Sequence, residues 1–221
     1  MAGRIIEWVR PQASEASDGI LTSAGICEGF AGAGVSTKVL IFAGLAGLVA
    51  GTLASGAMEY SKTGAERDRQ LAQLSCERLE LAAAPDVELD ELTELYVSRG
   101  LSRGLARQVA VELTARDALG AHAEAEYGIT AASLASPLRE ALAAGGAFVI
   151  GALLPWLTIT FIPGPPRAAV TFGIVVLALV LTGWISARIS DIHPVRPIVR
   201  AAAIGVLSMT ITYAAGHLLH P

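Results

Sequence analysis

Residues 39–60, VLIFAGLAGLVAGTLASGAMEY, decide the fold of this chain. A membrane-spanning helix needs about 20 mostly apolar residues, and residues 39–58 meet that need without one charged side chain. A second glycine-rich run, residues 19–36, comes just before and is interrupted by Glu28. Three further apolar runs follow later in the chain, at residues 141–162, 168–187 and 198–219. The pattern predicts an all-α membrane protein with five transmembrane helices.

The charged residues are concentrated in one segment. They make up 16% of the chain, against about 25% in an average soluble domain, and most of them fall between residues 61 and 136. Turn signals divide this segment into expected helices. The first continues from the end of the second span through Ala65 to about Ala83, and the others cover about 86–98, 102–114 and 117–127. We therefore expect a helical, water-exposed insert between the second and third spans. The net charge of −4 argues against nucleic acid as a partner.

The distribution of Lys and Arg predicts the orientation. Most of these residues lie in the N-terminal lead, in the insert and in the connection before the last span, so the positive-inside rule places these parts in the cytoplasm. The absence of an organelle-targeting segment favours a plasma membrane of bacterial type. The expected domains are a cytoplasmic lead at 1–17, transmembrane helices 1 and 2 at 18–60, a cytoplasmic insert at 61–136, and transmembrane helices 3 to 5 at 137–221.

Three carboxylates lie in or at the ends of the first two spans: Asp18, Glu28 and Glu59. A charge in lipid is costly, so such residues are candidates for an ion pathway. Asp18 also fits the N-cap of the first helix, and Glu59 also fits an interfacial residue. A carboxylate in the middle of a span, as at Glu28, is rarely accidental.

Small residues recur every four positions on both spans, for example Gly25 and Gly29 on the first and Gly47 and Gly51 on the second. Such stripes let helix backbones approach closely in lipid. They fit packing within one chain and also the seam of a homodimer.

Acidic and imidazole side chains share helix faces in the insert. The pairs are Glu77 with Glu80, Glu88 with Glu91, and His122 with Glu126. Residues three or four apart lie on the same side of a helix. Carboxylate oxygens with imidazole suit Mn²⁺ and Fe²⁺ better than Cu⁺, so the insert is a candidate metal-binding domain. Each pair alone also fits a solvated helix face whose acids pair with the neighbouring arginines.

Several short stretches match a known pattern. They are SDGILT at 17–22, GFAGAG at 29–34, GLAGLVAG at 44–51, RGL at 99–101 and DALGAH at 117–122. Together they resemble the first two spans and the insert of the vacuolar iron transporter family, in a member of bacterial type. The resemblance implies a five-span homodimer that moves Fe²⁺, and often Mn²⁺, out of the cytosol in exchange for protons. It also implies a pathway lined by the first two helices and an insert that binds metal on the cytoplasmic side.

The resemblance carries residue roles with it. Asp18 matches the membrane aspartate of the family, and the insert glutamates match at Glu77, Glu80, Glu88, Glu91 and Glu126. Some members place a methionine where Ser55 stands here, although Met58 lies one turn further on. The same members carry a methionine pair in place of His122 and Ala123, so this chain's site is harder than theirs.

These observations predict a proton-coupled exporter of Fe²⁺ or Mn²⁺ in a lipid bilayer, not an enzyme. The expected transport pathway contains Asp18, Glu28, Ser55, Met58 and Glu59, and the expected metal ligands are Glu77, Glu80, Glu88, Glu91, His122 and Glu126. One alternative is a membrane-anchored metal sensor or buffer without transport. A di-iron oxidase is disfavoured, because such bundles use Glu-x-x-His on two helices and Leu119 stands three residues before His122.

Overall fold

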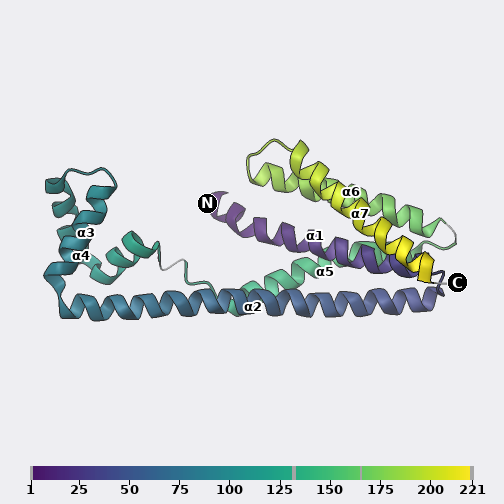
Figure 1. Cartoon of the computed structure of the whole chain (residues 1–221), viewed down its shortest axis with the longest axis horizontal. Helices are drawn as coiled ribbons and strands as arrows, with labels where there is room; N and C mark the ends of the chain where they lie inside the picture. The colour runs from purple at the N-terminus through teal and green to yellow at the C-terminus, as the bar shows by residue number, and fades with distance from the viewer. Residues whose placement is uncertain (1, 131–132, 165, 220–221) are drawn as a thin grey trace. The chain divides into compact units, whose positions relative to one another are not determined.

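The computed structural model describes residues 2–130, 133–164 and 166–219, with side chains from residue 11 onward. All regular structure in these ranges is α-helical (Figure 1). The helices are α1 (Ala2–Gly32), α2 (Thr37–Ala83), α3 (Pro85–Ser98), α4 (Arg103–Tyr127), α5 (Pro137–Phe161), α6 (Arg167–Ile189) and α7 (Val195–Leu219). Four of the described helices are long and apolar enough to cross a membrane: α2, α5, α6 and α7.

Helix α1 differs from the sequence-based expectation. It begins at Ala2 and takes in the lead that we expected to be separate, so Asp18 lies inside a helix and is not its N-cap. Pro11 removes one backbone hydrogen bond but does not end the helix. Helix α1 contains the first expected span, yet it is not among the four apolar candidates. Carboxylates such as Glu15, Asp18 and Glu28 lower its hydropathy.

Helix α2 runs without a break from the span at 39–58 through Ala65 to Ala83, as the sequence predicted. No proline falls in this stretch, and a lone glycine, Gly64, costs only about 1 kcal/mol in a helix. The helix stops at Ala83, close before Pro85, because a residue that precedes proline is disfavoured in helical conformation.

The chain divides into two compact units, and the first combines Met1–Glu59 with Glu140–Pro221. Within it α1, α6 and α7 lie side by side (Figure 1). Their shared core contains Ile20, Ala24, Val175, Leu179 and Met209. The backbones of α1 and α7 approach so closely that a Cβ atom on Gly216 would overlap the carbonyl of Gly29. Part of the small-residue stripe on α1 therefore serves packing inside the chain.

The second unit is Tyr60–Arg139, in which α3 packs against α4. Leu92, Ala110 and Ala125 form its buried apolar core. Helix α4 is broken at Asp117, whose φ of −162° and ψ of 88° are not helical. The Asp117 Oδ1 accepts the backbone N–H of Gly120 at 3.0 Å, so this side chain caps the second half of α4, where we expected a new helix to start.

Candidate metal centre

Four side chains of the second unit converge on one point. Glu77 comes from α2, Glu88 from α3, and His122 and Glu126 from the second half of α4. Each offers one possible ligand atom, and these four atoms all lie within 4.8 Å of one another. Nδ1 of His122 is 3.0 Å from Glu77 Oε1, 3.4 Å from Glu126 Oε1 and 3.8 Å from Glu88 Oε2. Three helices thus supply three carboxylates and one imidazole to a single centre.

The centre lies in the interior of the unit. His122 is 0% exposed and Glu77 is 1% exposed. Glu77 Oε1 and His122 Nε2 are buried, and neither has a hydrogen-bond partner among the described residues. Burying a carboxylate oxygen without a hydrogen-bond partner is costly, and a cation bound between Nδ1 of His122 and the carboxylates would satisfy Glu77 Oε1. Carboxylate oxygens with one imidazole nitrogen form a donor set that suits Fe²⁺ or Mn²⁺.

The charges in the centre repel one another. Burial raises the pKa of Glu77, and the nearby Glu126 carboxylate raises it further. Burial also raises the pKa of Glu88, to which the charge of Glu91 contributes. Both shifts show that the folded chain disfavours ionised carboxylates here. A divalent cation reverses that preference, because it becomes the largest local charge of opposite sign.

The second member of each acidic pair lies outside the centre. Glu80 and Glu91 are exposed, although Glu80 raises the pKa of Glu77 and Glu91 raises that of Glu88. The thiol of Cys76 donates to Glu80 Oε1 at 3.5 Å. The structure therefore brings four of the six predicted ligands together and leaves two at the edge of the same cluster.

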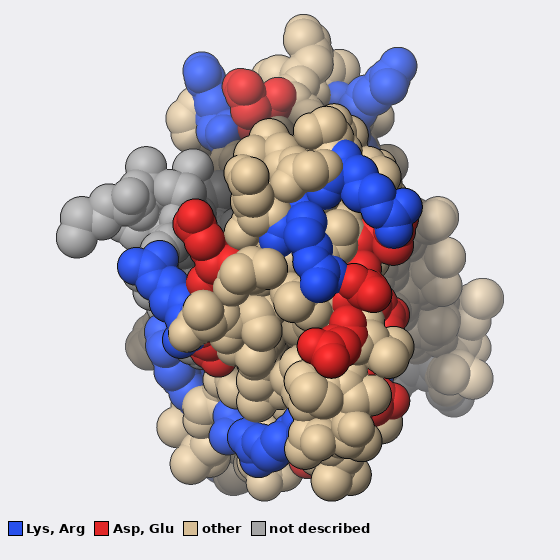
Figure 2. Space-filling model, turned by 90° about the vertical axis from the view of Figure 1, so that its left-hand side faces the viewer, with Lys and Arg blue, Asp and Glu red and all other residues tan. Residues whose placement is uncertain are grey.

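Other acids of the insert pair with arginine. Arg103 forms an ion pair with Glu94, and Arg107 forms one with Asp90. On the face shown in Figure 2, acidic and basic side chains are interspersed and form no broad field of one sign. The alternative interpretation of the acidic rows, a solvated and paired face, holds for these residues but not for the four that converge on the centre.

In the first unit, Glu28 is 2% exposed, and its Oε1 has no hydrogen-bond partner in the described ranges. It lines a cavity of about 450 Å³ together with residues of α6 and α7, among them Phe172, Met209 and Tyr213. No residue of α2 lines this cavity. Asp18, in contrast, is exposed. Asp18 and Glu28 therefore have different surroundings.

Comparison with known proteins identifies the family. The sequence model of the VIT family matches residues 10–217, almost the whole chain. The chain belongs to the VIT family. A protein of Acanthamoeba castellanii named vacuolar iron transporter is 33% identical over 96% of this chain and 78% of its own length. Vacuolar iron transporter 1 of Tulipa gesneriana is 29% identical over 90% of this chain and 81% of its own. The protein of the same name from Oryza sativa subsp. japonica is 28% identical over 94% of this chain and 83% of its own length.

In this VIT family member, α1 and α2 meet at a polar contact. The hydroxyl of Ser55 donates to Glu15 Oε2 at 2.6 Å. Sequence reasoning missed Glu15, because it placed the lead outside the helix. The sequence feature that could have pointed to Glu15 is its position three residues before Asp18, which puts the two carboxylates on one side of α1. Of the other predicted pathway residues, Glu59 is half-buried and Met58 is 72% exposed.

Proposed function

We propose that this VIT family member is a transporter that carries Fe²⁺ or Mn²⁺ out of the cytosol in exchange for protons. The observation that carries the proposal is the buried centre of Glu77, Glu88, His122 and Glu126. Its donor set fits these two cations, and relatives named vacuolar iron transporter support iron as cargo. The lack of a thioether or thiolate among the four makes the centre hard, so we expect Mn²⁺ to compete well with Fe²⁺.

The proposed architecture has five spans, formed by the four apolar helices and the part of α1 that contains Glu28. The N-terminus and the insert face the cytosol, because the flanking Lys and Arg residues favour that side. We propose that two chains associate as a homodimer. In this arrangement the insert collects metal on the cytosolic side before transport.

Proton exchange follows from ligand chemistry. Carboxylate and imidazole groups bind a metal only when they are deprotonated, so binding releases protons and depends on pH. Inside the membrane, a carboxylate such as Glu28 is stable when it holds a proton or faces a cation, and unstable as a lone charge. Alternation of Asp18 and Glu28 between these two states moves metal one way and protons the other.

Reconstituted protein tests the proposal. Liposomes that contain a divalent-sensitive dye are given an imposed proton gradient and external Mn²⁺ or Fe²⁺. We expect gradient-dependent metal flux that is reduced strongly in Asp18→Asn and Glu28→Gln. Asp191→Asn is the matched control, because Asp191 is an exposed turn residue with φ of 50°, a conformation that asparagine tolerates. Metal binding without flux would instead support the sensor or buffer.

A further inference from the structure

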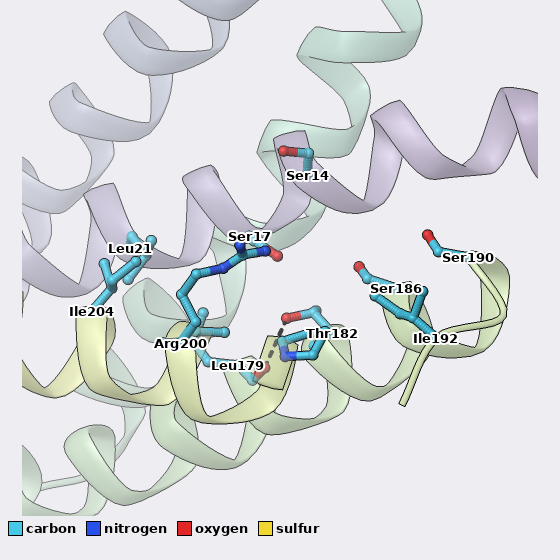
Figure 3. A pocket seen from close by; sticks show the side chains of 13 residues that line it. Ser14, Ser17, Leu21, Leu179, Thr182, Ser186, Ser190, Ile192, Arg200 and Ile204 are labelled. Atoms are coloured by element: carbon cyan, nitrogen blue, oxygen red, sulfur yellow. Dashed lines mark hydrogen bonds between the residues drawn. The ribbon is translucent and has the colours of Figure 1, made fainter. Parts of the chain in front are cut away.

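The first unit contains a polar cavity that the proposed transport does not use. It has a volume of about 380 Å³ and lies between α1, α6 and α7 (Figure 3). Five hydroxyl side chains line it: Ser14, Ser17, Thr182, Ser186 and Ser190. Arg200 also lines it, whereas no Asp or Glu is among its lining residues. The cavity therefore combines hydroxyl groups with one permanent positive charge.

The cavity lies where two apolar helices end. It reaches Ser190, directly after α6, and Ile192 in the connection, and it continues to Pro197 in the first turn of α7. Arg188 in the last turn of α6 and Arg196 in the first turn of α7 flank the same connection. Polar side chains and arginines of this kind at the ends of apolar helices belong to the membrane surface, where lipid headgroups lie.

Most polar groups of the cavity are available to a ligand. Arg200 is exposed, and no described residue forms an ion pair or hydrogen bond with its guanidinium. The hydroxyls of Ser14, Ser186 and Ser190 likewise have no hydrogen-bond partner within the described ranges. Those of Ser17 and Thr182 donate to carbonyls of their own helices, at 2.9 and 3.1 Å. In Figure 3 the Arg200 side chain extends from α7 toward Ser17 of α1.

The charge of the cavity selects the class of ligand. The C-terminus of α6 and the N-terminus of α7 meet at this edge, so the negative end of one helix dipole offsets the positive end of the other. The guanidinium of Arg200 then sets the sign, and it repels Fe²⁺ and Mn²⁺. An anion that accepts several hydrogen bonds fits, and Arg with hydroxyl donors is a common combination for phosphate.

We propose that this cavity binds a phosphate group, with Arg200 pairing with its charge and Ser14, Ser186 and Ser190 donating hydrogen bonds. The phosphate belongs either to the headgroup of an anionic phospholipid or to a small soluble molecule. A cavity of about 380 Å³ accommodates either source. This site is independent of the metal centre and of the direction of transport.

The test uses the full chain in nanodiscs of phosphatidylcholine, with and without phosphatidylglycerol, and with inorganic phosphate added to the discs that lack phosphatidylglycerol. Thermal unfolding is measured in each, and retained lipid is measured by native mass spectrometry. The variant is Arg200→Gln, and Arg196→Gln is the control, since it removes a neighbouring exposed charge that does not line the cavity. The double variant Ser186→Ala with Ser190→Ala tests the site if Arg200→Gln does not fold.

A lipid site would be established if phosphatidylglycerol stabilises the protein and is retained by it. Arg200→Gln should then weaken lipid binding roughly tenfold, and Arg196→Gln should leave it unchanged. Stabilisation by inorganic phosphate alone, with the same dependence on Arg200, would establish a site for a soluble phosphate. The proposal is overturned if neither probe stabilises the protein. It is also overturned if the two arginine variants lose binding equally, since that marks general attraction of surface charge.

Discussion

Nδ1 of His122 lies 3.0 Å from Oε1 of Glu77, and both side chains are almost fully buried. This contact joins the second half of α4 to α2 within the insert. The hydroxyl of Tyr127 donates to the other oxygen of Glu77 at 3.4 Å, which fixes the carboxylate with Oε1 toward the imidazole. The two ligand atoms are thus turned toward one another.

Removal of a ligand should weaken metal binding far more than removal of a nearby charge. We expect His122→Ala and Glu77→Gln each to raise the Kd for Mn²⁺ by about tenfold or more, equivalent to about 1.4 kcal/mol. Electron paramagnetic resonance of free Mn²⁺ measures this in the full chain. Glu124→Gln is the control, because Glu124 is exposed on the same helix. Equal losses in Glu124→Gln and the ligand variants would contradict the assignment.

The metal-free insert should become less stable as pH rises. The pKa values of Glu77 and Glu88 are raised in the folded state above the ordinary 4.5, so the folded chain holds protons that the unfolded chain releases. Their contribution to stability is present at low pH and is lost as pH rises from about 4.5 through the raised pKa values. Hydrogen exchange of α3 and α4 amides, corrected for intrinsic rates, measures it.

Two controls separate this effect from general pH dependence. Glu77→Gln should flatten the slope, because the amide does not titrate. Saturating Mn²⁺ at pH 7 should restore protection, since binding to the folded state alone stabilises it. Protection that rises with pH in the metal-free chain would contradict the expectation.

The contact between Ser55 and Glu15 should appear as a coupling energy. We expect a double-mutant cycle with Ser55→Ala and Glu15→Ala to give about 1 kcal/mol, as is usual for residues in direct contact. Reversible unfolding in detergent measures the four proteins. A cycle of Ser55→Ala with Asp18→Ala is the comparison, and it should be additive, because no hydrogen bond joins those two residues. Additivity in both cycles would show that the Glu15 contact has no energetic weight.

Close packing of α1 and α7 should make one glycine irreplaceable. A Cβ on Gly216 would overlap the Gly29 carbonyl, so we expect Gly216→Ala to destabilise the chain by about 1–3 kcal/mol through overpacking. Gly173→Ala makes the same chemical change where no atom lies within 4 Å, and it should be close to neutral. Melting temperatures in detergent measure both. Similar shifts in the two variants would exclude the steric explanation.

Sequence periodicity predicted the helices of the insert well, because local signals end them. Pro85 follows the end of α2, Asp117 caps the second half of α4, and Gly128 adopts a φ of +66° after it. Periodicity failed for α1, because the lead contains no comparable stop signal and Pro11 is tolerated inside the helix. The same error hid Glu15.

The metal centre was predictable only in part. Spacing places Glu77 with Glu80 and Glu88 with Glu91 on common helix faces, but it does not say which member points inward. Tertiary packing decides that, and it leaves Glu77 and Glu88 buried and their partners exposed. His122 enters the centre with Glu126 because four residues separate them, and here the local rule was sufficient.

The depth of His122 has a kinetic consequence. An ion that binds this imidazole must give up most of its water shell, and its access is limited to the side of Glu88 and Glu126, whose side chains are 10% and 14% exposed. Exchange of an ion held there would then be slower than exchange at an exposed carboxylate, and the insert would retain each ion longer before releasing it.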